Sequence, residues 1–343
     1  MPLTDDQVRE LVGRFATLDM TGWDEAAFDR APAHLGWLPT RASAEERKRS
    51  RLYPRLWNYE DFRPGCKGES HDQYDTGLGT GLGQVARHGS DLGSEISVPV
   101  GEGEDLFLSV RAALEETLGP PSIMRGPGPL LRWRNPVRLL ELEHAGGHTS
   151  LRVSPTDAVD RDEHLSSNWA EPEHTLEQLG YWQVLGRGWD WAPGGVWADD
   201  WNQFEEQLAT TLGSVVRDFA LLDVPDRFTV VVRTPEDLRF VQWTTFEDWT
   251  LHLQARVPDD PGPGWSEAMA DLGWQPADSR DLDGLLTCDF PTVGWQEAQT
   301  AARMLVGALR SYGVPFDDLW HEVISPDVEL LGIGLPTKRG GRV

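Results

Sequence analysis

The sequence predicts an α+β fold made of tandem small antiparallel sheets, each covered by helices. Three observations predict it. Two groups of three strand-like runs are bounded by turn residues, and amphipathic helical stretches follow each group. A Leu-Gly-aromatic triplet also recurs at 35–37, 179–181 and 272–274. Glycine in that position is typical of a helix C-terminus, so each triplet predicts the end of a short helix.

Each group of strand-like runs predicts a three-stranded meander. Asn135-Pro136 and Gly146-Gly147 separate the runs of the first group. In the second group Val230 and Val232 alternate with Thr229 and Arg233, which is typical of a sheet with one buried face and one wetter face. The predicted strands are 131–134, 137–143 and 150–153 in the first group, and 228–233, 238–243 and 249–257 in the second.

Four longer stretches predict amphipathic helices, because their apolar residues recur every three or four positions. The last three each end in a proline-containing segment, which cannot continue a helix. The four apolar stripes are Val8, Leu11, Phe15 and Leu18; Phe107, Val110, Leu114 and Leu118; Trp201, Phe204, Leu208, Leu212, Val215 and Phe219; and Trp295, Ala298, Ala302, Leu305 and Leu309.

The repeated order of strands, short helix, strand and long helix predicts three units, at 1–127, 128–226 and 227–343. The first unit diverges, since it lacks the leading meander and carries an insertion at about 41–90. Alternating glycines at 77–83 predict a flexible loop there instead of a phosphate-binding loop, because no helix follows directly. An alternative stays open: the long helix of one unit packs under the next meander and makes a continuous body.

Charge and cysteine content exclude several classes of function. The chain has 343 residues, 31 basic and 56 acidic side chains and a net charge of −25. Nucleic acid and anionic membranes would repel such a chain, so we expect neither as a partner. Cys66 and Cys288 are its two cysteines, and no stretch is long and apolar enough for a signal peptide or a membrane span. We expect a cytoplasmic protein.

No established catalytic motif occurs, so we expect no enzyme and no cofactor. Two alternatives depend on tertiary contacts. His144 and His148 flank a turn and could bind a metal with Glu141 or Glu143, although polar residues beside turns are commoner. Cys288 could pair with a histidine as a nucleophile.

The acidic run of Asp157, Asp160, Asp162 and Glu163 lacks the spacing and the glycine of an EF-hand. It predicts a solvated acidic loop.

Aromatic residues give the best candidate for a binding surface, since the chain carries 16 Trp. Trp133 lies between Arg132 and Arg134, and Trp243 and Trp249 flank a turn. Exposed on a sheet face, these five residues would form the aromatic, arginine-flanked patch typical of protein interfaces. Trp133 could equally belong to the core while its arginines reach solvent.

The repeat resembles the superfamily of type III secretion chaperone and YbjN-like domains, called TY-Chap in actinobacteria. Residues 238–320 carry most of this resemblance, with Leu238 to Trp243, Leu272 to Pro276, the helix from Trp295 to Tyr312, and Gly313-Val314-Pro315. Residues 131–225 match more loosely, and the first 127 fit poorly. The scarcity of lysine beside abundant Arg, Gly, Pro and Trp is also typical of high-GC actinobacteria.

The resemblance implies a non-enzymatic module that binds another polypeptide, as a chaperone, a regulator or an immunity-like partner. The charge favours a partner with a basic surface or segment and predicts salt-sensitive association. Two other hypotheses remain: an enzyme or metal-binding protein whose site is assembled from scattered His, Glu and Cys residues, and a self-assembling protein that pairs open sheet edges.

Overall fold

The structure, a computed structural model, divides the chain into two compact units, each described by itself. The first comprises Met1–Met124, Gly128–Leu165 and Gly186–Trp189, and the second Arg125–Pro127, Ser166–Leu185 and Asp190–Val343. The residues that the structure describes are 3–40, 70–87, 94–169, 175–176, 179–185, 196–224, 228–234, 239–245, 248–277, 284–324 and 327–337. Among their helices, none has the length and apolar character needed to cross a membrane.

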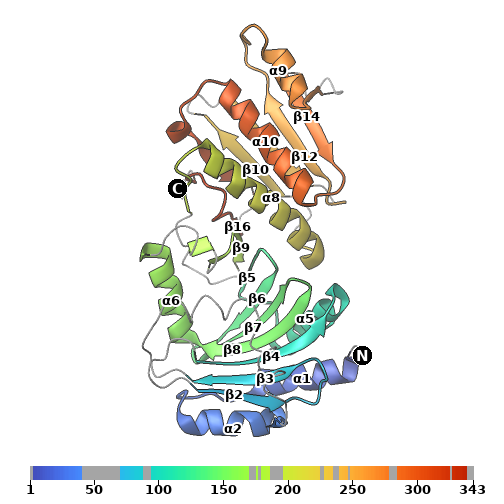
Figure 1. The fold of residues 1–343 in the computed structure, drawn as a ribbon, viewed down its shortest axis with the longest axis vertical. Helices are drawn as coiled ribbons and strands as arrows, with labels where there is room; N and C mark the ends of the chain where they lie inside the picture. The colour runs from blue at the N-terminus through green and yellow to red at the C-terminus, as the bar shows by residue number, and fades with distance from the viewer. Residues whose placement is uncertain are drawn as a thin grey trace. The chain divides into compact units, whose positions relative to one another are not determined.

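The first unit contains an antiparallel sheet with the strand order β1-β2-β3-β4-β8-β7-β6 (Figure 1). The predicted first meander is confirmed as β6, β7 and β8. The division between the units falls within β5 (Ile123–Gly126). The strands of the sheet are β1 (Leu38–Pro39), β2 (Ser70–Asp75), β3 (Leu82–Arg87), β4 (Glu95–Glu102), β6 (Leu130–Arg134), β7 (Arg138–Ala145) and β8 (His148–Pro155).

Helices α1 (Asp5–Thr17), α2 (Glu25–Leu35) and α5 (Glu104–Leu118) cover one face of this sheet. Thr4 and Gln7 form a capping box that starts α1, and the predicted stripe from Val8 to Phe15 is buried. Gly36 ends α2 with φ +73°, a left-handed conformation that favours glycine, as the first triplet predicts.

The opposite face of the first sheet is charged, and helix α6 (Thr156–Trp169) lies against it. The sequence predicts a solvated acidic loop at 157–163, and this prediction is wrong. Asp160 and Glu163 are three residues apart, so they lie on the same side of a helix, where they contact arginines of β6. Those contacts join residues about 30 positions apart and cannot be inferred from the acidic run alone.

Of the alternating glycines predicted to form a flexible loop, Gly77, Gly79 and Gly81 do lie outside the strands, whereas Gly83 does not. Gly77 and Gly79 lie in the turn of a hairpin between β2 and β3, both with φ +72°, and Gly83 is inside β3. Strand pairing therefore enters the predicted insertion at 41–90. The remainder of that insertion, at 41–69 and 88–90, lies outside the described residues.

The second unit contains a six-stranded antiparallel sheet with the order β13-β14-β12-β11-β10-β15. The predicted second meander is confirmed as its strands β10, β11 and β12. Its strands are β10 (Phe228–Arg233), β11 (Phe240–Thr245), β12 (Leu251–Arg256), β13 (Gln275–Pro276), β14 (Leu285–Phe290) and β15 (Trp320–Val323). The unit also holds the short antiparallel pair of β9 (Trp182–Leu185) and β16 (Val328–Glu329), where β9 neighbours β5 in the strand order.

Helices α8 (Trp201–Leu222), α9 (Trp265–Asp271) and α10 (Trp295–Ser311) pack over this sheet, and α8 lies directly against α10 (Figure 1). The Phe219 ring of α8 meets Phe228 of β10 edge-on, with 5.4 Å between centroids. The helix that ends the predicted central unit thus packs with the C-terminal sheet. This agrees with the alternative that the long helix of one unit packs under the next meander. The three-unit division of the repeat stays a prediction.

Candidate functional site: the uncovered face of the second sheet

The strand register of the second sheet assigns every side chain to one of two faces, because successive residues of a strand point to opposite sides. Val230 lies opposite Trp243, and Trp243 lies opposite Leu253. These three side chains therefore share one face, and their neighbours in sequence share the other.

One face is the core of the unit. Each of its central side chains is at most 1% exposed, and α8, α9 and α10 supply the apolar cover. These side chains are Phe228, Val230 and Val232 of β10, Val241, Trp243 and Thr245 of β11, and Leu251, Leu253 and Ala255 of β12. The alternation that the sequence shows in β10 is the origin of this face.

No described helix covers the other face, and most of its side chains are partly exposed. Polar side chains pair across its strands. Thr229 hydrogen-bonds to Thr244, and the Gln242 amide donates to Gln254. The His252 imidazole of β12 contacts the Asp289 carboxylate of β14. The face presents fixed hydrogen-bonding groups instead of an apolar layer.

Apolar and charged side chains lie along the β15 side of this face, at both ends of the strand. Ile324, directly after β15, is 58% exposed and lies opposite Thr229. The Ile324 backbone N–H donates to the Thr229 carbonyl at 2.8 Å. The Arg233 guanidinium lies 5.7 Å from the Trp320 ring centroid and donates to Glu322 over 3.3 Å. Partly exposed aromatic and aliphatic groups beside an arginine are the composition typical of protein interfaces.

The edge of this sheet is only partly covered. β13 contributes two residues and pairs with Leu286 and Thr287 of β14. In the described strand order nothing else pairs with that side of β14. An edge of this kind can accept another strand, so self-assembly through it stays a prediction that size-exclusion chromatography would test.

The five residues predicted to bind a partner occupy different surroundings in the two units. Trp133 and Trp243 are 7% and 1% exposed and belong to the cores of their own sheets. The Trp133 indole donates to the Gly119 carbonyl at 2.7 Å. Trp249 is partly buried, with φ +61°, in the turn before β12. For both buried rings the structure therefore favours the core alternative.

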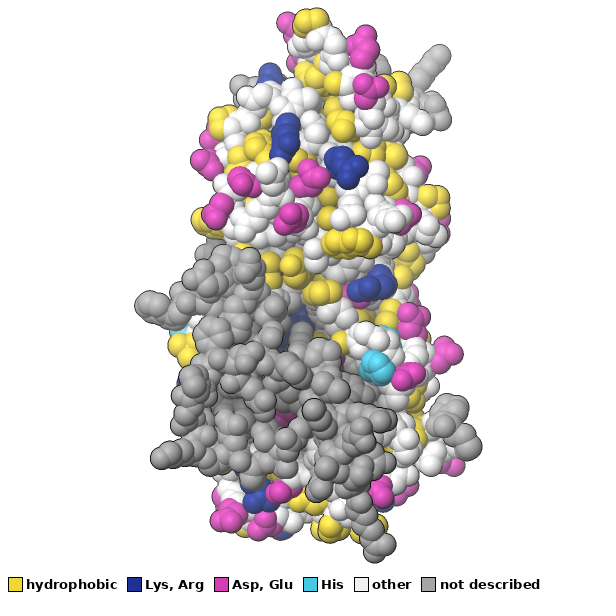
Figure 2. Space-filling model, in the orientation of Figure 1, with side chains coloured by type: hydrophobic (Ala, Val, Ile, Leu, Met, Phe, Trp, Pro, Cys, Tyr) yellow, Lys and Arg dark blue, Asp and Glu magenta, His cyan; other side chains and the backbone are white. Residues whose placement is uncertain are grey.

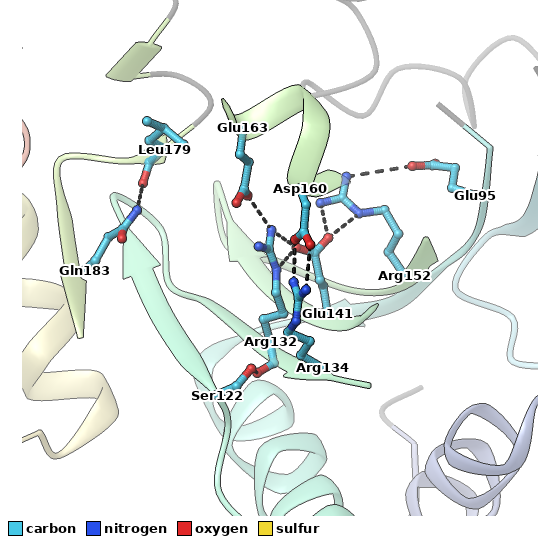
Figure 3. Close-up of polar contacts among 10 residues, drawn as sticks. All are labelled: Glu95, Ser122, Arg132, Arg134, Glu141, Arg152, Asp160, Glu163, Leu179 and Gln183. Atoms are coloured by element: carbon cyan, nitrogen blue, oxygen red, sulfur yellow. Dashed lines mark hydrogen bonds and ion pairs between the residues drawn. The ribbon is translucent and has the colours of Figure 1, made fainter. Parts of the chain in front are cut away.

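Arg132 and Arg134 lie on the opposite face of β6 from Trp133. They donate hydrogen bonds to two carboxylates of α6, Arg132 to Glu163 and Arg134 to Asp160 (Figure 3). Arg132 is buried; it donates to Glu141 at 2.6 Å and to Glu163 at 2.8 Å, and these two carboxylates raise its pKa against the effect of burial. Arg134 binds both oxygens of Asp160, and that hydrogen bonding raises its pKa. Partner binding by the five residues stays a prediction.

The structure separates the two histidines of the metal hypothesis. His144 lies opposite Thr149 and Ala145 lies opposite His148, so the two imidazoles point to opposite faces of the sheet. His144 is buried, 3.0 Å from the Thr149 hydroxyl, and Glu141 instead binds arginines. Within the described ranges no three His, Cys, Asp or Glu side chains converge as metal ligands would.

The thiol hypothesis meets the same obstacle. Cys288 lies opposite Leu253, whereas Asp289 lies opposite His252, so the thiol and the imidazole are on different faces of the sheet. Burial and the neighbouring Asp289 carboxylate raise the pKa of the Cys288 thiol. A protonated thiol is a weak nucleophile. Cys66, the other cysteine, lies outside the described residues.

Trp320 and Ile324 were not predicted as binding residues from the sequence. Their signal is the period-two spacing of Trp320, Glu322 and Ile324 in a stretch of only a few residues. The strand that fixes their orientation, β10, lies about 90 positions earlier. The spacing therefore places these side chains on the uncovered face only once β15 is known to pair with β10.

Comparison with known proteins bears on this unit. Residues 194–327 match the model of a family described as TY-Chap3, T3SS (YopN, CesT) and YbjN peptide-binding chaperone 3. The matched segment holds the entire six-stranded sheet. No curated protein and no solved structure matches the chain. The TY-Chap3 match supports the resemblance seen at 238–320 and extends it upstream to include α8.

Proposed function

We propose that the chain is a non-enzymatic, chaperone-like or regulatory module that takes up a segment of another polypeptide on the uncovered face of the second sheet. One observation carries this proposal. The family match coincides with a sheet whose described helices all pack on one side, and that family is described as peptide-binding.

The chemistry of the face suits a polypeptide ligand. Burying Ile324 and the ring of Trp320 against apolar side chains of a partner supplies the hydrophobic gain, roughly 25 cal/mol for each Å² removed from water. The paired amides of Gln242 and Gln254 can exchange their mutual hydrogen bond for bonds to a partner backbone. A ligand of mixed polarity therefore fits better than a purely apolar one.

Charge adds a preference for basic partners. The net charge is −25, and on the visible side Asp and Glu side chains are spread over the described surface instead of gathering in one patch (Figure 2). Such a distributed field accelerates encounter with a basic segment and weakens as salt screens it. The same acidic balance and the low cysteine content favour a cytoplasmic location, which cell fractionation would test.

An array of 15-residue peptides of varied charge and hydrophobicity, probed with the full chain, tests the proposal. We expect bound peptides to be apolar and basic, and Ile324→Asp to weaken their binding at least tenfold. Leu38→Asp is the matched control, because Leu38 is 67% exposed, belongs to the other unit and adds the same charge. Equal binding by both variants would contradict the assignment of the face.

A further inference from the structure

Over 156–165, the part of α6 whose side chains are described, carboxylates and not an apolar stripe attach the helix to the first sheet. Among its residues with described side chains, 156–165, Ala158 is the buried apolar residue, whereas Leu165 is 43% exposed. Asp160 and Glu163 supply the contacts, to Arg134 and Arg132. A helix held in this way leaves its surface more readily than one held by buried leucines.

The surface beneath α6 carries a cluster of arginines, which is unusual in an acidic protein (Figure 3). Three arginines project from β6 and β8 on this face, namely Arg132, Arg134 and Arg152. Among the described strand residues, Glu141 and Glu95 contact Arg152, and the Glu143 carboxylate also acts electrostatically on it. Asp160 and Glu163 of α6 both act on Arg134, and Glu163 also binds Arg132, so displacing α6 would remove these carboxylates and favour their replacement by carboxylates from elsewhere.

Arg132 offers more hydrogen bonds than α6 accepts. Its Nε and Nη2 atoms are bonded to Glu141 and Glu163, whereas its Nη1 atom is buried and has no hydrogen-bond partner. A buried guanidinium N–H without an acceptor costs free energy. A ligand carrying a further acceptor would satisfy it better than α6 does.

We propose that α6 acts as an internal ligand of this site, and that an acidic helical segment of a partner protein, with two carboxylates three residues apart, binds there in its place. When a carboxylate of the partner replaces Glu163, the positive charge of the buried Arg132 keeps the same number of carboxylate neighbours. A neutral segment would leave the buried Arg132 with only the Glu141 carboxylate, which it shares with Arg152, and weakening a buried ion pair in this way is unfavourable. This surface lies in the first unit and prefers the opposite charge, so it is independent of the peptide-binding face proposed above.

A labelled peptide with the α6 sequence, residues 156–169, tests this exchange by fluorescence anisotropy with the full chain. The receptor variant is Asp160→Asn with Glu163→Gln, which weakens the internal ligand while preserving side-chain shape. We expect it to bind the peptide at least tenfold more tightly than the wild type. A twin peptide with Asn and Gln in place of the two acids should bind at least tenfold more weakly. Adding Arg134→Gln to the receptor should abolish the gain.

Asp157→Asn is the matched control, because Asp157 is an exposed acid of the same helix. It should behave as the wild type. Hydrogen exchange gives a second readout: α6 amides should exchange at least tenfold faster in the double variant, while β7 and β8 stay protected. If the double variant does not fold, Asp160→Asn alone carries the same test. Equal binding of the acidic and neutral peptides, or unchanged exchange in α6, would overturn the proposal.

Discussion

Replacement of two neighbouring residues of β11 should have sharply different effects on stability. Trp243 is 1% exposed and lies in the core, so Trp243→Ala should destabilise the second unit by about 3–5 kcal/mol. Gln242 points to the uncovered face and hydrogen-bonds to Gln254, so Gln242→Ala should cost about 0.5–1.5 kcal/mol. The difference follows only from which face each residue occupies.

Peptide-resolved hydrogen exchange over β11 and β12 measures both effects as local opening free energies. Since about 1.4 kcal/mol corresponds to a tenfold change, Trp243→Ala should speed exchange by roughly two to four orders of magnitude, and Gln242→Ala by about tenfold or less. Only the Gln242 variant should weaken peptide binding at nearly constant stability. Similar exchange rates in the two variants would refute the assignment of faces.

Three further predictions concern titration and charge. Burial lowers the pKa of His321 to about 4. Between about pH 6.5 and 4 the unfolded chain therefore binds a proton that the folded chain does not. Urea unfolding should show a loss of about 2–3 kcal/mol between pH 7 and 4.5, which His321→Asn should remove. In a Cys66→Ser background, Cys288 should react slowly with iodoacetamide until the chain is unfolded, because its thiol pKa is raised; fast reaction in the native state would count against its environment. Glu141→Gln should destabilise the first unit by about 3–5 kcal/mol, because it removes the carboxylate shared by two arginines, whereas the exposed Glu102→Gln should cost about 0–1 kcal/mol; urea unfolding of both variants measures the difference.

Helical stripes and strand alternation, which depend on residues close in sequence, were enough to predict most of the helices and both meanders. The stripes at 8–18, 107–114 and 204–219 are buried faces of α1, α5 and α8, because a helix places every third or fourth residue on one side. Both meanders follow from alternation and turn residues. Two stripe ends, Leu118 and Trp295, are 40% and 57% exposed, since each lies at the last or first residue of its helix.

Long-range pairing accounts for what the sequence did not predict. The run at 157–163 forms a helix on the sheet because Arg132 and Arg134, about 30 positions earlier, attract its carboxylates. Trp133 and Trp243 are in the core because their strands are covered on that side, a property of the assembled unit. The candidate face depends on β15 returning to pair with β10, and no local pattern indicates that return.

Site-specific photo-crosslinking shows directly whether a peptide binds on the uncovered face of the second sheet. A benzophenone side chain is placed at Gln242, on the uncovered face of the second sheet, or at Gln299, an exposed position of α10. Each full-length variant is irradiated with the tightest-binding peptide from the array, and the adducts are read by mass spectrometry. Peptide binding on the uncovered face predicts efficient crosslinking from position 242 and little from 299. Crosslinking from 299 alone would contradict it.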